Sequence, residues 1–326
     1  MAFTKQYFRR KVLWAGNEDV PGTMETLTGT VNAILTRNLE VQPLEGEVLS
    51  RELDKETFGS DPATRVGVHA RISFDVEIAG AGAPGDLPAY HPLLLGSCHD
   101  FEVLDDGEVS PTDIAARYFP IDTDAASLTM WIPWDRTLHK CKAARGSLTI
   151  VTDKRQYGYL RFEFLALVEA IEDQASMPTS DRSAFVKPVP FRAATVDFTA
   201  FGAKRALHRL TVNGGQEIAF YETSEAETLE QEDRNSTFEA TVEQQLIADW
   251  AVWSQIENDT TGAAEMIFGP AGNDGSNLVG IYLNSIQITG VSQANENGIK
   301  ALQISGPVIA DGSTPEYEII VGEQPA

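Results

Sequence analysis

Residues 66–78 alternate strictly between apolar and polar side chains. One parity is apolar throughout, whereas the other carries polar residues and Gly67, with Arg71, Asp75 and Glu77 among its charged members. This pattern indicates a strand with one buried and one solvent-facing side. At about 3.3 Å per residue such a strand spans roughly 40 Å, well beyond the usual five or six residues. The chain is therefore expected to be rich in β structure, with this strand running the full height of its domain.

Length and charge narrow the possible functions. A length of 326 residues favours two domains of about 150 residues each. The formal net charge of the chain is -23. The acidic balance argues against gripping a phosphate backbone and against binding an anionic membrane surface. No apolar run approaches the ~20 residues of a membrane span, and no secretion signal is evident, so a protein that stays in the cytoplasm where it is made is expected. Cys98 and Cys141 could be free thiols or one disulfide.

Three polar segments stand out. Residues 1–45 resemble an arm that either docks on a neighbour or frays. Residues 46–64 and 221–234 predict two long polar loops, the first being alternatively a hairpin, and loops of this length are uncommon unless they are functional or disordered. Their charged residues are Arg51, Glu52, Asp54, Lys55 and Glu56 in the first, and Glu227, Glu230, Glu232, Asp233 and Arg234 in the second.

The second half of the chain restates the first. Helices are predicted within 87–98 and 245–256, and a linker-like stretch places a domain boundary near residue 180, giving domains 1–180 and 181–326. Each half reads as polar loop, strand, helix, hairpin, hairpin and strand. Segments 146–150 and 158–164, joined by a turn, match 284–288 and 298–304, and 127–133 matches 264–270. Chance similarity between two β-rich halves remains the alternative.

Catalytic and cofactor motifs are weak. Gly80, Gly82 and Gly85 fit a dinucleotide-binding spacing, but a strand that alternates does not suit the buried first strand of that fold. The five histidines lack metal-ligand spacing, and no serine-nucleophile motif is present. The turn at 271–275 lacks a full Ca²⁺ ligand set. We therefore predict no catalytic residue, no cofactor and no metal, and not an enzyme.

Several segments resemble a known family. Phe-Arg-Arg-Lys-Val-Leu-Trp at 8–14, the segment 37–46, and the charged loop leading into 71–78 look like the start of major tail tube proteins of long-tailed bacteriophages with non-contractile tails. The second half is similar to the second domain of duplicated members. It has Asp233 and Arg234 before a strand, Asp249 and Trp250 on the expected helix, and a hairpin at Asn297.

The resemblance implies a mainly β (α+β) fold of two tandem tail-tube-like β-sandwich or barrel domains, each with a flanking α-helix and a long loop. Such chains form trimeric, pseudo-hexameric rings that stack into a channel for DNA delivery. On this resemblance Arg71, Asp75 and Glu77 are expected to face either the lumen or a neighbouring subunit, and the lumen is preferred. The resemblance places the two polar loops, with the arm, between rings. It implies a tape measure protein and DNA inside without specific binding, tail terminator and distal tail proteins at the ends, no membrane, and location in the virion tail after synthesis in the host bacterial cytoplasm.

Two points stay open. An insertion near residues 100–122 departs from the family pattern. A tail-tip, baseplate or adhesin-like carbohydrate-binding β-sandwich is the alternative function, for which Trp131 and Trp134 would be the candidate sugar-stacking residues.

Overall fold

The computed structural model describes residues 5–51, 53–105, 113–269, 276–310, 312 and 314–322. Glu52, residues 106–112 of the insertion and the turn at 271–275 lie outside the described residues. The fold is mainly β, with 56% of residues in strands and 4% in helices, as predicted. In the part of the chain that is described, the helices are α1 (His91–Gly96) and α2 (Val252–Glu257).

The strands follow one another in both halves of the chain. In the first half they are β1 (Leu13–Asn17), β2 (Ala33–Ile34), β3 (Arg37–Ser50), β4 (Ala63–Glu77), β5 (His99–Asp105), β6 (Asp113–Pro120), β7 (Leu128–Trp134), β8 (Thr137–Asp153) and β9 (Tyr159–Asp173). In the second half they are β10 (Val196–Ala200), β11 (Ala203–Lys204), β12 (Leu207–Asn213), β13 (Gln216–Glu222), β14 (Glu227–Arg234), β15 (Thr237–Glu243), β16 (Thr261–Phe268), β17 (Val279–Gln287), β18 (Gly290–Glu296), β19 (Ile299–Pro307) and β20 (Tyr317–Gly322).

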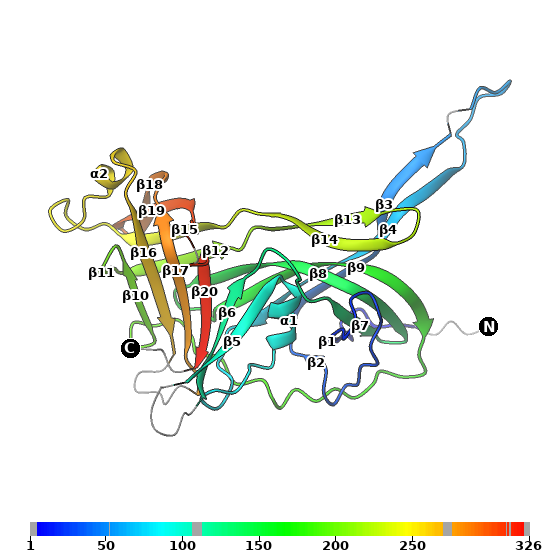
Figure 1. Ribbon diagram of the computed structural model, residues 1–326, viewed down its shortest axis with the longest axis horizontal. Coiled ribbons are helices and arrows are strands. Elements are labelled where there is room, and N and C mark those ends of the chain that lie inside the picture. The colour runs from blue at the N-terminus through cyan, green and yellow to red at the C-terminus, as the bar shows by residue number, and fades with distance from the viewer. Residues whose placement is uncertain are drawn as a thin grey trace.

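Two sheets each join both halves (Figure 1). The larger, eleven-stranded sheet contains the continuous antiparallel path β3-β4-β9-β8-β12-β15-β19-β18, in which β12 of the second half pairs with β8 of the first. The smaller, seven-stranded sheet has the order β11-β10-β16-β17-β20-β6-β5, and β20 of the second half pairs with β6 of the first. A separate two-stranded ribbon, β13–β14, lies over β8 and β9.

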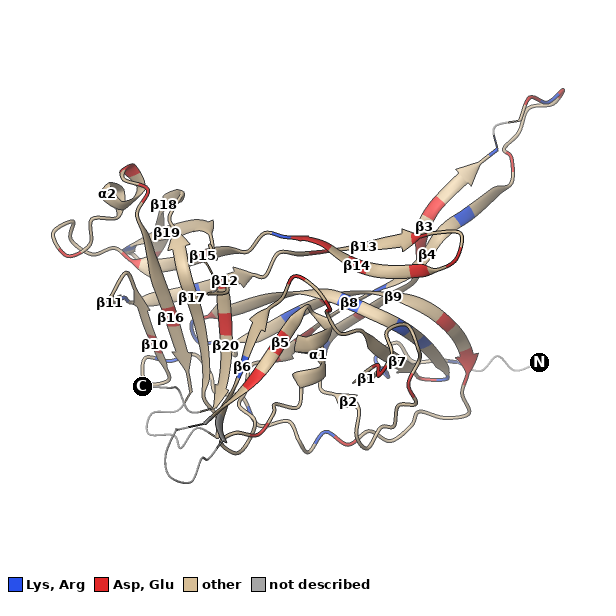
Figure 2. Ribbon diagram, viewed as in Figure 1, with Lys and Arg blue, Asp and Glu red and all other residues tan. Residues whose placement is uncertain are grey.

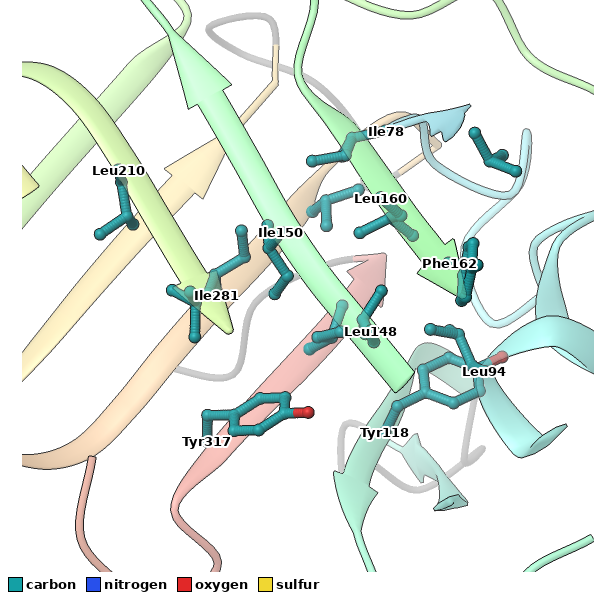
Figure 3. Packing of buried hydrophobic residues seen from close by; sticks show 14 of the residues in the cluster. Ile78, Leu94, Tyr118, Leu148, Ile150, Leu160, Phe162, Leu210, Ile281 and Tyr317 are labelled. Atoms are coloured by element: carbon teal, nitrogen blue, oxygen red, sulfur yellow. The ribbon is translucent and has the colours of Figure 1, made fainter. Parts of the chain in front are cut away.

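The core lies between the two sheets. Leu148, Ile150 and Leu210 of the larger sheet and Ile281 and Tyr317 of the smaller sheet belong to one buried cluster (Figure 3). Full burial of such a side chain stabilises a fold by roughly 1.5–3 kcal/mol. Because this cluster takes residues from both halves, the predicted boundary near residue 180 does not separate two independent cores. The division into two domains stays a prediction.

The opening alternation and the first helix are confirmed. Residues 66–77 lie within β4, and Ile72, Phe74 and Val76 are buried on one side of it. The helix expected within 87–98 is α1, which buries Leu93 and Leu94.

The expectation of an N-terminal arm is wrong from residue 13 onward. Leu13 and Ala15 are buried, and β1 pairs with β7 inside the larger sheet. The preceding residues also contact their own chain, since Arg10 forms an ion pair with Asp135 at 2.8 Å. The basic residues that suggested a free arm therefore flank an apolar strand that the core requires.

Two further expectations are corrected. Segment 221–234 is not a loop: β13 and β14 form a hairpin whose turn is limited to residues 223–226. The helix predicted over 245–256 is reduced to the six residues of α2. Leu246 and Ile247 are 75% and 65% exposed, so the first part of that segment has no core to pack on, and short helices depend on such packing.

The repeat is visible in strand order. β3-β4-β9-β8 and β12-β15-β19-β18 are the same four-strand arrangement, placed side by side in one sheet. Segments 158–164 and 298–304 occupy equivalent places, leading into β9 and β19. The match of 146–150 with 284–288 is wrong, because 146–150 lies in β8 of the larger sheet and 284–287 in β17 of the smaller sheet. The match of 127–133 with 264–270 is also wrong, because 127–133 belongs to the larger sheet as β7 and 264–268 to the smaller sheet as β16.

Candidate channel face and assembly surfaces

The larger sheet presents one continuous polar face. A single register row crosses it through Arg37 on β3, Asp75 on β4, Arg161 on β9, Thr149 on β8 and Asn213 on β12. The row continues onto β15 and β19. Each of these side chains lies opposite the buried face of its strand, since successive residues of a strand point to opposite sides. The solvent-facing side predicted for one strand is thus shared by both halves of the chain.

Arginines on this face are held by carboxylates. Arg71 donates to Glu45 at 3.0 Å and also pairs with Glu163, and Arg209 donates to Asp153 at 2.8 Å. The hydrogen bond to Glu45 raises the pKa of Arg71, and the bond to Asp153 raises that of Arg209. These guanidinium groups therefore already carry a counter-charge and are poorly placed to hold a phosphate.

The three residues predicted to face a lumen all lie on this face, but they differ in exposure. Arg71 is exposed, and Glu77 lies 4.0 Å from Arg37. Asp75 is only 4% exposed, and it accepts hydrogen bonds from Asn38 at 2.8 Å and from Arg161 at 3.1 Å. Asp75 is therefore a buried structural carboxylate that fastens β3 and β9 to β4.

The first polar segment forms the outer half of the β3–β4 hairpin, which extends away from the body (Figure 1). Arg51, Asp54, Lys55 and Glu56 lie in its exposed tip, where Lys55 pairs with Asp61. Charged residues of both signs follow this ribbon (Figure 2). It also carries a concentration of exposed apolar side chains: Leu44, Val48, Leu49, Leu53 and Phe58.

The second polar segment is the β13–β14 ribbon, and it lies against its own chain. Leu229 of β14 is 1% exposed and packs in a small apolar cluster with Ala143 and Leu167 of the first half. Phe220 of β13 stacks on His69 of β4 with ring centroids 5.6 Å apart. The ribbon therefore covers an apolar patch at the end of the polar face, where it lies over β4, β8 and β9.

Ion pairs reinforce this cover. Arg145, which is buried on β8, donates to the carboxylate of Glu230 and to the carbonyl of Leu229. Arg234 bonds Glu316 at 3.0 Å and Asp122 at 2.8 Å. Of the charged residues predicted to lie between rings, Glu230 and Arg234 thus bind within the chain, whereas Glu227, Glu232 and Asp233 are exposed.

A buried polar network fixes the base of the ribbon. Gln216, the first residue of β13, donates to the Tyr317 hydroxyl at 3.0 Å, and Nε2 of His99 lies 2.8 Å from the same oxygen. Burial lowers the pKa of His99 to about 4. Sequence reasoning missed this network and Arg145, because each partner lies tens to hundreds of residues away in the chain.

The aromatic pair proposed for sugar binding is engaged in packing. Trp131 stacks on Trp14 at 6.3 Å between ring centroids, and Lys140 lies over the Trp131 ring. Trp134 contacts Phe8 edge-on at 5.2 Å and donates to its carbonyl at 3.0 Å. Neither indole offers the free ring face that sugar stacking needs.

Among the described residues there is no group of three or more His, Cys, Asp or Glu side chains placed to hold a metal ion. None of the described helices is long and apolar enough to cross a membrane. The chain matches no model of a known protein family, and no curated protein is similar to it in sequence.

Proposed function

We propose that this chain is a structural subunit of a phage tail tube, and that its copies form stacked rings around a channel for DNA. The observation that carries the proposal is the eight-strand path of the larger sheet, a duplicated four-strand unit with one polar face and two open ends. Among the described residues, β3 and β18 at those ends are each paired on one side only. Open strand edges are covered in stable proteins, and pairing with another copy is one way to cover them.

The junction between the halves supplies the template for pairing between copies. Within the chain, β8 of the first unit pairs antiparallel with β12 of the second. Because β18 and β3 hold the equivalent places, β18 of one copy pairs with β3 of the next. Such head-to-tail contacts close into a ring when the rotation per copy divides a full turn.

Three copies give a channel of suitable width. Eight strands in each copy make 24, and strands about 4.8 Å apart and tilted about 40° then form a barrel roughly 50 Å across. A side-chain layer about 5 Å deep, half the ~10 Å spacing of packed sheets, leaves a lumen of roughly 40 Å at heights where no ribbon covers the sheet. A DNA duplex passes through such an opening.

The chemistry of the polar face suits passage without binding. Its arginines are paired with carboxylates, and its neutral positions are filled by Thr and Asn side chains such as Thr149 and Asn213. Binding of DNA depends on cations that replace counterions along the backbone, and this face offers few of them. The tape measure, tail terminator and distal tail proteins belong to the same proposal.

Substitutions on exposed positions of the face test it. The Asp75 side chain is unsuitable, because a lysine there would be buried against Arg161. Instead, Glu163→Lys combined with Ser73→Lys changes the charge of the face by +3 at paired positions of β9 and β4. Tubes should still assemble under electron microscopy, while DNA ejection from virions carrying the variant slows markedly at low salt. Glu163→Gln with Ser73→Thr is the matched control.

Two results would sink the proposal. The first is a purified chain that stays monomeric at high concentration. The second is unchanged ejection by the lysine variant in virions that contain it, because the face would then not line the channel.

A further inference from the structure

The two ribbons are equivalent elements with different surroundings. β3 and β12 match when Val41 is set on Leu210, because these residues pair with Ile72 and Ala240, which hold the same place in the two units. The same register sets Leu49 on Ile218. It also sets Gly46 on Gly215, and both glycines have positive φ where the ribbon leaves the sheet. The outer half of β3–β4 is thus the counterpart of β13–β14.

The surface under the β13–β14 ribbon has a counterpart as well. Ile218 packs beside Leu165 and Leu167 of β9. Matching 158–164 to 298–304 sets these two leucines on Ser305 and Pro307 of β19. In the second unit this position is an open groove of about 550 Å³ on the polar face of the sheet. It is lined mainly by residues of β12, β15 and β19, among them Thr211, Asn213, Glu239, Ser305 and Pro307, and it reaches Thr149 of β8. One half therefore has its groove covered by a ribbon, and the other does not.

The β3–β4 ribbon has the opposite deficiency. Val48, Leu49 and Phe58 are 59%, 53% and 110% exposed, and an isolated two-stranded ribbon is marginally stable in water. Within one copy it extends from the far side of the first unit, away from β18 and β19 (Figure 1). The same chain therefore has one apolar ribbon that packs on no surface of its own copy and one groove that no ribbon of its own copy covers.

We infer that the β3–β4 ribbon of one copy lies in the β15–β19 groove of an adjacent copy, with Leu49 against Ser305 and Pro307. This contact repeats, between copies, the seating of β13–β14 on the first half within a copy. It rests on the proposed ring assembly and deepens it, because it assigns the ribbon to the lateral neighbour in the ring. In this inference residues 46–64 contact a neighbour within the same ring, beside the β18–β3 junction, and not a copy in the adjacent ring.

A cysteine pair tests the contact in the full chain. In the double variant Leu49→Cys, Ser305→Cys, both new thiols replace side chains on accessible parts of the surface. The native Cys98 and Cys141 are buried, and burial raises the pKa of each thiol to about 12, so they do not compete. A disulfide forms only when the two Cβ atoms approach within about 3.5–4.5 Å.

Mild oxidation of assembled particles should convert most of the chain into covalent dimers and trimers on a non-reducing gel. The series should stop at three, because a closed ring joins each ribbon to one groove. The matched control, Leu49→Cys with Thr261→Cys on the smaller sheet, should stay monomeric on the gel. Amides of residues 44–50 should also gain hydrogen-exchange protection on assembly of the unmodified chain.

Different failures give different readings. Particles that assemble but do not cross-link would overturn the contact while leaving the tube intact. A covalent series that continues beyond three copies would place the ribbon between rings and overturn the lateral assignment. Absence of any particle from the unmodified chain would remove the proposed function and this inference together.

Discussion

The β13–β14 and β3–β4 ribbons hold equivalent places in the two halves of the chain, but only the first is packed against its own chain. The first places Leu229 and Ile218 on an apolar patch and is clamped by Arg145. The second keeps Val48 and Leu49 exposed. Two equivalent ribbons are therefore buried to different extents within one copy. The exposed ribbon and the open groove are the surfaces that a second copy would cover.

The largest expected effect on stability comes from truncating the buried side chain of the β13–β14 ribbon. Leu229→Ala should lower the free energy of unfolding of the isolated chain by about 2–4 kcal/mol, because it removes a fully buried side chain and leaves a cavity. Chemical denaturation of the monomer measures this. A loss below about 0.5 kcal/mol would mean that the ribbon is not seated in solution.

A change of pH should weaken the base of the same ribbon. Because burial holds the pKa of His99 near 4, below its unfolded value of about 6.5, the folded chain disfavours the protonated ring. Stability is highest above pH 6.5 and falls by about 3 kcal/mol as pH decreases to about 4. His99→Gln should flatten much of this slope in denaturation curves, with His91 and His139, whose pKa values are also lowered, leaving a remainder. An unchanged slope would contradict the role of His99.

Removing the Arg145 side chain, which holds the β13–β14 ribbon on β8, should have an intermediate effect on stability. Arg145→Met removes donors to Leu229 and Ala125 carbonyls and should cost about 2 kcal/mol in the isolated chain. Glu230→Gln is the control, and because Glu230 is half exposed its loss should stay near or below about 1 kcal/mol. Equal losses for the two variants would show that the exposed carboxylate, and not the buried arginine, fixes the ribbon.

The smallest effect is expected on the uncovered ribbon. Leu49→Ala should change the free energy of unfolding of the monomer by no more than about 0.5 kcal/mol, since its side chain is exposed there. The same variant should raise the concentration at which rings form in analytical ultracentrifugation. A destabilised monomer would mean that Leu49 is already buried within its own copy.

Sequence patterns predicted the fold class and the strand around Ile72 because alternation alone distinguishes a half-buried strand. They misassigned segment 221–234, where six carboxylates surround the buried Leu229 and where Ile218 and Phe220, which pack with it, lie outside the segment. The contacts that seat this ribbon join residues such as Arg145 and Glu230, which are 85 positions apart. Local patterns carry no information about such pairs, so the covered and uncovered grooves emerge only from the folded chain.

The most direct measurement is a cryo-electron microscopy reconstruction of particles assembled from the purified chain. The account predicts threefold rings in which the polar face of the larger sheet lines a lumen, roughly 40 Å wide where no ribbon covers the sheet. It also predicts that β18 of each copy pairs with β3 of the next. Particles in which β3 and β18 remain unpaired, or in which the polar face of the larger sheet points outward, would contradict it.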